Sequence, residues 1–205
     1  MAETNVNARL EAFCDGVFAI ALTLLIIDIK VPPSSTLATT KDLWRALGQL
    51  VPSLLVFLLS FAVILITLVN HHATLKLVDR ASPPFIYANG CLLLGVVFIP
   101  FPTALLGEYL LTDHSAPAVI LYAAVFGFQG LGWNLLTRAA LKPRALTRDE
   151  KSAQAMRKRH RYSYFAMTIY AACAIAAVWV PHTVAIVLGL IWTVWIVLSI
   201  NTRDE

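Results

Sequence analysis

The sequence predicts an all-α integral membrane protein with six transmembrane helices, and three observations support this fold class. Hydrophobic residues make up 59% of the chain and charged residues only 14%, whereas soluble domains carry about 25% charged residues. The mean hydropathy is +0.73. The apolar residues also gather into runs of roughly the 20 residues that a membrane-spanning helix needs. We therefore expect residues 1–205 to form a single transmembrane domain.

The predicted spans follow one another with short connections. The apolar runs cover residues 13–31, 43–70, 89–102, 116–141, 162–180 and 183–200. We expect Pro100 and Pro102 to end the third span, because proline lacks the N–H donor and blocks the turn of a helix. Only Pro181 and His182 separate the last two runs, so these two spans must form an antiparallel hairpin.

Lysine and arginine residues gather on one side of the predicted membrane. With an even number of spans, that side holds both termini and a densely basic connecting loop at about residues 142–161. The opposite side receives only Lys30, Lys41 and Arg45. Because basic loops stay in the cytoplasm, we expect both termini to be cytoplasmic. The basic residues behind the net charge of +4 are thus a topology signal, and they also lie where they can contact anionic lipid headgroups. The charge does not indicate nucleic acid as a partner.

The first span, at about residues 7–30, carries a narrow apolar stripe. At about 100° per residue in a helix, the stripe consists of Phe13, Ile20, Leu24 and Ile27, with Thr23 on its flank. Asp15 points almost to the opposite side, toward the surrounding helices. By periodicity alone, ordinary helix packing or lipid contact explains this stripe better than a pore lining does.

Polar side chains meet at the cytoplasmic ends of the first three spans. The second span runs antiparallel to the first, which places His71 and His72 level with Asp15. Asn89 begins the third span at the same depth. A proton relay or a metal site is one hypothesis for this cluster, and a structural hydrogen-bond network is the other. Adjacent histidines point about 100° apart on a helix and do not easily share a metal ion, so we favour the network.

The sequence offers no pattern that is typical of an enzyme. It contains no GxSxG, P-loop or HExxH motif, and no TVGYG-like potassium filter. Its three cysteines lie far apart, without a CxxC pair. We therefore expect a protein that is not an enzyme and that holds no cofactor and no resident metal.

Residues 9–15 read RLEAFCD and continue as GVFAIALTLL. This segment resembles the RxxxFSD helix of the lysosomal and endosomal potassium channel family, the transmembrane protein 175 family, and specifically its bacterial members with one six-helix repeat per chain. The resemblance extends to NHH at residues 70–72 and to residues 89–103. It covers the first half of the chain well, whereas the last three spans match only in number and hydrophobicity. Cys14 replaces the usual serine, and Leu68 stands where relatives often carry tryptophan.

The resemblance implies a homotetramer that conducts potassium ions through a bacterial inner membrane, with the first helix of each subunit lining the pore. It implies that Ile20 forms the principal constriction, with Leu24 and Ile27 below it and Thr23 beside it. The motif that holds the helices together near the cytoplasmic mouth would then consist of Arg9, Phe13 and Asp15, with His71 and Asn89 as polar partners. Apolar rings of this kind can gate a pore by dewetting.

Two other functions remain open from the residues themselves. A proton-coupled membrane transporter would use Asp15 together with His71 and His72. A membrane scaffold without transport activity would need none of these side chains for chemistry. The number of subunits separates the first of these from a channel, because a pore on a symmetry axis needs several subunits, whereas a transporter can work alone.

Overall fold

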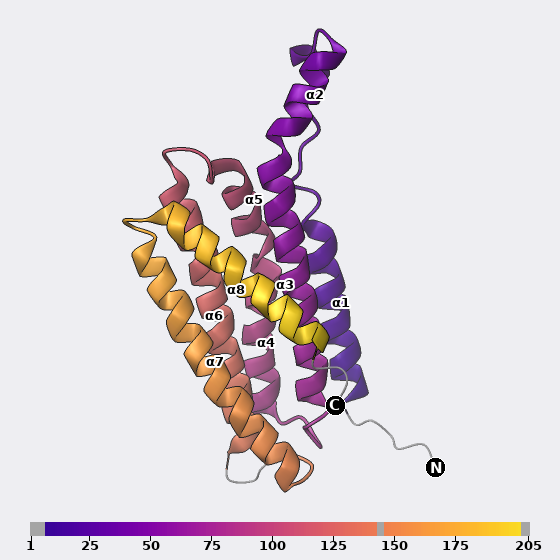
Figure 1. Ribbon diagram of the computed structural model, residues 1–205. Coiled ribbons are helices and arrows are strands. Elements are labelled where there is room, and N and C mark those ends of the chain that lie inside the picture. Colours follow the sequence, from indigo (N-terminus) through magenta and orange to yellow (C-terminus); the bar gives the residue numbers. More distant parts are fainter. Residues whose placement is uncertain (1–6, 143–145, 202–205) are drawn as a thin grey trace.

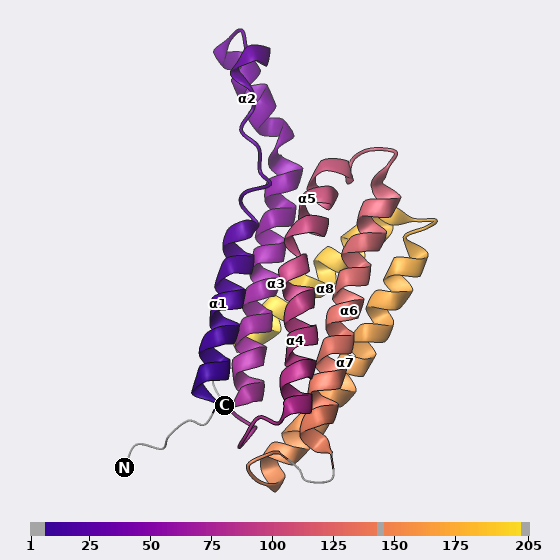
Figure 2. The same ribbon diagram turned by 180° about the vertical axis from the view of Figure 1, so that it is seen from behind.

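The computed structural model describes residues 7–142 and 146–201, and these form a bundle of helices (Figure 1). This confirms the all-helical fold class. The elements are α1 (Ala8–Leu24), the short 3-10 helix η1 (Ser34–Thr36), α2 (Thr40–Gln49), α3 (Val51–Leu75), α4 (Pro83–Phe98), α5 (Pro100–Tyr109), α6 (Ser115–Leu141), α7 (Glu150–Ala176) and α8 (Pro181–Asn201). Figure 2, the view from behind, places α1 at one side of the bundle and α7 at the other.

The first helix is shorter than the predicted range of about 7–30. Regular α-helix ends at Leu24, and the chain continues through tighter turns in which the Ile27 N–H bonds to the Leu24 carbonyl (3.2 Å). Several β-branched residues follow Leu24 before Pro32 and Pro33, and both residue types favour the end of a helix. Ile27 therefore lies just beyond α1.

The second predicted span divides into two helices. Residues 40–49 form α2, an amphipathic helix in which no residue is buried. Its start is fixed by a capping box, because the Thr39 side chain and the Asp42 side chain each bond to the backbone N–H of the other. Only Leu50 separates α2 from α3, and α2 projects beyond the rest of the bundle (Figure 1). The apolar content at residues 43–50 thus belongs to a protruding helix.

The expectation that Pro100 and Pro102 end the third span is wrong. Helix α4 stops at Phe98, but Ile99 keeps helical backbone angles and α5 begins at Pro100. A proline in the first turn of a helix costs little, because the N–H groups of that turn have no partner within the helix. In α5, Thr103 is buried and bonds to Ser60 of α3 (2.8 Å). The apolar segment Pro83–Tyr109 therefore continues through the prolines.

The basic loop predicted at residues 142–161 is mostly helix. Helix α7 begins at Glu150, where the Asp149 side chain accepts a hydrogen bond from the Ser152 backbone N–H (2.7 Å). That bond lowers the pKa of the Asp149 carboxyl. Polar residues with good helix propensity extend α7 past its apolar half, and a prediction based on apolar content does not detect such an extension. Arg144, a member of the predicted loop, lies outside the described residues.

Among the described residues, three helical segments are long and apolar enough to cross a membrane. They are Val51–Leu75, Pro83–Tyr109 and Ser115–Leu141. A shorter apolar stretch occupies Pro181–Val197 of α8. Helix α1 begins and α8 ends toward the same end of the bundle (Figure 1).

The packing of α4 against α6 depends on the absence of a side chain at Gly132. A Cβ at this position would lie 2.7 Å from the Leu92 Cα atom, which belongs to the backbone and cannot rotate away. We expect Gly132→Ala to force α4 and α6 apart and to lower the free energy of unfolding by about 1–2 kcal/mol. The change should appear as a lower midpoint of thermal unfolding in detergent. Gly90→Ala is the matched control, because a Cβ there meets nothing within 4 Å.

Candidate pore helix and its polar network

Helix α1 has one face packed into the subunit and one face that the subunit leaves open. Cys14, Phe18 and Ala21 are buried against the neighbouring helices. The residues of the predicted stripe point the other way, and their exposed fractions are 62% for Phe13, 58% for Ile20, 37% for Leu24 and 69% for Ile27. A single subunit therefore presents a row of large apolar side chains along α1. Helix α1 itself lies at the side of the bundle away from α7 (Figure 1).

Thr23 lies on the open face beside Ile20. Its hydroxyl donates a hydrogen bond to the Ile20 carbonyl (2.9 Å). With its proton directed to the backbone, the Thr23 oxygen keeps its lone pairs available as an acceptor. Cations bind hydroxyl groups through these oxygen lone pairs.

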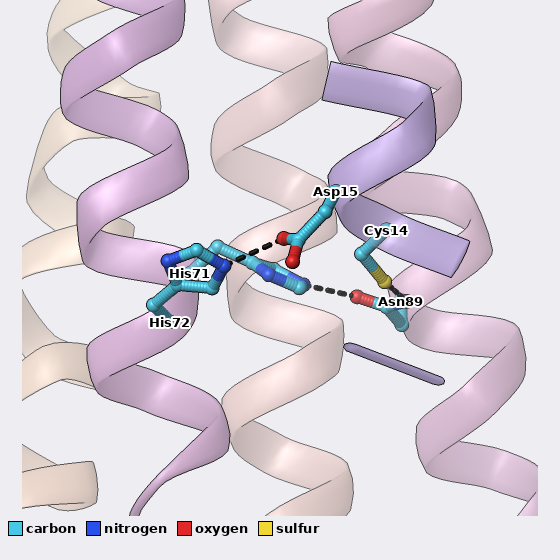
Figure 3. Close-up of polar contacts among 5 residues, drawn as sticks. All are labelled: Cys14, Asp15, His71, His72 and Asn89. Atoms are coloured by element: carbon cyan, nitrogen blue, oxygen red, sulfur yellow. Dashed lines mark hydrogen bonds and ion pairs between the residues drawn. The ribbon is translucent and has the colours of Figure 1, made fainter. Parts of the chain in front are cut away.

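The packed face of α1 is joined to α3 and α4 by a buried chain of hydrogen bonds (Figure 3). The Asn89 side-chain oxygen lies 2.7 Å from Nε2 of His71, and the Asn89 amide nitrogen donates to the Cys14 sulfur (3.1 Å). All three residues are buried. Because the Asn89 oxygen can only accept, Nε2 of His71 carries the proton of this hydrogen bond. The Cys14 sulfur is thus the acceptor that connects α1 to Asn89 of α4.

Of the two histidines expected at the depth of Asp15, His72 is the one that bonds to it, whereas His71 and Asn89 reach the motif through Cys14. Asp15 accepts a hydrogen bond from Nε2 of His72 (2.6 Å), in a contact where both side chains stay partly exposed, 35% for His72 and 46% for Asp15. The angular separation of adjacent residues on a helix explains this outcome. His71 turns inward to Asn89, and His72 turns to the edge where Asp15 lies (Figure 3).

The base of α1 is held by a residue that sequence reasoning missed. Asn7, which precedes α1 and is buried, donates to the Val78 carbonyl (3.1 Å) and accepts from the Ala81 N–H (2.9 Å). Both partners belong to the connection between α3 and α4. An asparagine just before a helix is a common capping signal, but its partners are 71 or more residues away. Arg9, two residues further along, is exposed in the single subunit.

Comparison with known proteins finds relatives along nearly the whole chain. A family model described as "Endosomal/lysosomal potassium channel TMEM175" matches residues 9–100. A potassium channel from Chamaesiphon minutus is 41% identical over 191 residues, which cover 92% of this chain and 94% of the relative. The chain belongs to the TMEM175 family. A second relative, a potassium channel from Streptomyces collinus, is 43% identical over 162 residues, or 76% of each chain.

A solved structure extends the TMEM175 likeness to the second half of the chain. The crystal structure of a lysosomal potassium-selective TMEM175 homolog from Chamaesiphon minutus has a TM-score of 0.78 and 37% sequence identity, and the match covers 93% of this chain and 97% of that chain. The family match at residues 9–100 contains α1, α3 and α4. The hydrogen bonds from α1 to Asn89 and to His72 therefore lie within the part of the chain that carries the TMEM175 pattern.

Proposed function

We propose that this TMEM175 chain is a subunit of a potassium-preferring cation channel that conducts passively, with four copies around a common axis and α1 of each copy lining the pore. The relatives named as potassium channels support the ion and the activity. The channel acts without enzymatic chemistry and without a cofactor, and potassium is only a permeant species. Its place is the inner membrane of a bacterium, in contact with lipid, with both termini in the cytoplasm.

The observation that carries this proposal is the division of α1 into two faces. A pore helix needs one face free of contacts within its own subunit, and the opposite face must be fixed so that the pore keeps its radius. Helix α1 meets both conditions. Ile20 and Phe13 are free of the subunit core, while Cys14 and Asp15 connect the other side of α1 to α4 and α3.

The proposed constriction consists of apolar rings with a ring of hydroxyls beside them. Ile20 forms the principal ring, and Leu24 and Ile27 extend the apolar path. In a narrow apolar ring an ion loses water without gaining a replacement ligand, so conduction depends on the hydration of the ring. The Thr23 oxygen, an available acceptor, offers a ligand next to this barrier. This arrangement favours a weakly hydrated cation over a strongly hydrated one.

Six membrane crossings per subunit agree with the described helices. The three long apolar segments supply half of them, and the other three are α1 with its following turns, the apolar half of α7, and α8. An even number of crossings returns the chain to its starting side, which agrees with the common end of the bundle at which α1 begins and α8 ends (Figure 2).

The proposed assembly predicts four subunits per particle. Light scattering or mass photometry of the purified protein in detergent and in lipid nanodiscs should give a mass of four chains of 22.5 kDa each, after correction for bound detergent or lipid. A stable monomer that retains ion transport would contradict a pore on a symmetry axis and would favour the transporter hypothesis.

The activity itself is tested by recording currents from the purified protein in planar bilayers. With potassium on one side and sodium on the other, the reversal potential should show a preference for potassium. Currents should vary with the electrochemical gradient of the permeant ion alone. Transport that requires a proton gradient would contradict the proposal, as would a correctly assembled tetramer without any current.

A further inference from the structure

A concave apolar groove lies between α7 and α8. The two helices meet at the hairpin before Pro181 and diverge from there (Figure 1). The groove has a volume of about 430 Å³. Its walls include Tyr162, Phe165, Ala166 and Ile169 of α7 and Leu190 and Val194 of α8. Such a concave site differs from a flat lipid-facing surface, because a long apolar chain can lie between its two walls.

Basic side chains continue the α7 wall of the groove toward the start of that helix. Lys158 precedes Tyr162 by one helical turn, and Arg161 precedes Phe165 by one turn. The Lys158 ammonium group lies 5.9 Å from the centre of the Tyr162 ring, which forms part of the groove. Both cations are exposed. Arg159, between them, donates to the Asn70 carbonyl (3.5 Å) and belongs to the contact between α7 and α3.

We propose that this groove binds one anionic phospholipid per subunit, with an acyl chain between α7 and α8 and the phosphate group at Lys158 and Arg161. The dimensions agree. From Tyr162 to Ile169 the α7 wall extends for roughly 10 Å at 1.5 Å per residue, which fits within the roughly 15 Å depth of one leaflet. The basic residues then lie at headgroup level, at the end of the groove that belongs to the basic, cytoplasmic side.

A lipid is a better occupant of the groove than a second copy of the chain. Figures 1 and 2 place α7 and α1 on opposite sides of the bundle. If α1 faces the fourfold axis, as proposed above, the groove faces the surrounding bilayer. The charge pattern points the same way, because an apolar groove with cations at one end is complementary to a molecule with a long apolar tail and one anionic end.

Native mass spectrometry of the detergent-purified tetramer provides the test. The protein is titrated with phosphatidylglycerol or with phosphatidylcholine, and the bound lipid molecules are counted per subunit. We expect one phosphatidylglycerol per subunit at concentrations where phosphatidylcholine does not bind. Lys158→Gln combined with Arg161→Gln should weaken phosphatidylglycerol binding about thirtyfold, since each of the two cations near the membrane surface contributes about 1 kcal/mol.

Two further variants complete the test. Arg138→Gln combined with Lys142→Gln removes the same charge from exposed positions at the end of α6, and it should leave binding unchanged. Leu190→Trp fills the groove from α8 and should reduce binding of phosphatidylglycerol without altering the headgroup site. Equal binding of the two lipids, or an equal loss in the α6 variant, would overturn the proposal.

The same spectra separate this inference from the proposed function. A loss of tetramers in the Leu190→Trp variant would show that the groove is covered by a neighbouring subunit, and it would overturn the lipid site while leaving the channel proposal in place. If the unmodified protein is not a tetramer, the channel proposal fails irrespective of the lipid count. The lipid proposal is then overturned if phosphatidylglycerol shows no preference over phosphatidylcholine.

Discussion

Replacement of Ile20 by asparagine is expected to raise potassium conductance about tenfold and to reduce the discrimination between potassium and sodium. A tenfold change corresponds to a barrier lowered by about 1.4 kcal/mol. The physical reason is that dewetting of a narrow ring depends on its radius and on the polarity of its wall. The asparagine side chain is smaller in volume than that of isoleucine, and its amide offers an oxygen. The measurement is the current amplitude and the reversal potential under matched bi-ionic conditions. Ile20 has few contacts within its subunit, so the variant should fold.

The matched control is Ile26→Asn. Ile26 is 52% exposed, close to the 58% of Ile20, but it lies about 120° from Ile27 around the chain axis, because the tight turns after Leu24 have about three residues per turn. The same change of side chain should therefore leave the current nearly unaltered. Thr23→Ala should alter selectivity less than Ile20→Asn, because the hydroxyl lies beside the apolar stripe. Unchanged currents in an assembled Ile20→Asn tetramer would place the barrier at Leu24 or Ile27.

Replacement of Asn89 by leucine is expected to lower the free energy of unfolding by about 2–3 kcal/mol. A hydrogen bond between membrane helices contributes only about 0.6 kcal/mol on average, so the two lost bonds explain the smaller part. The larger part comes from the Nε2–H group of His71, which stays buried without an acceptor, at about 1–3 kcal/mol. Thermal unfolding of the purified protein measures the loss.

Asp15→Ala is the comparison that tests this reasoning. The Asp15–His72 contact is partly exposed, so its loss should cost less than about 1 kcal/mol. We also expect Asp15→Ala to affect stability or assembly more than ion selectivity, because Asp15 points away from the open face of α1. A larger destabilisation by Asp15→Ala than by Asn89→Leu would mean that the half-exposed contact, and not the buried chain, fixes α1.

The hydrogen bonds that fix α1 are also expected to affect conductance, because α1 lines the proposed pore. If the Cys14–Asn89–His71 chain sets the position of α1, the Asn89→Leu variant should show altered or unstable conductance in channels that still assemble. Cys14→Ser is a useful companion, because it replaces the thiol by a hydroxyl group of similar shape. We expect Cys14→Ser to retain the bond with the Asn89 amide, which lies 3.1 Å from the sulfur, and to leave conductance intact.

The fold class and the apolar stripe of α1 follow from the order of the amino acids alone. Composition and the length of the apolar runs suffice for the first, because lipid tolerates only backbone that satisfies its own hydrogen bonds. Helical periodicity suffices for the second, and the exposure of Phe13 and Ile20 agrees with it. The fragment RLEAFCD also indicates the family, because polar residues inside a span are costly and rarely retained by chance.

The ends of the helices and the pairing of the polar groups, in contrast, depend on how the helices pack. Apolar content indicates which residues lie in the membrane, but it does not detect a helix that continues into water. For this reason the sequence predicts a loop where the structure has the first turns of α7. Proline chemistry gave the wrong end for the third span, because a proline is harmless when it opens a new helix at Pro100. The partners of His71 and His72 depend on how α3 is rotated between α1 and α4, and the packing of three helices sets that angle.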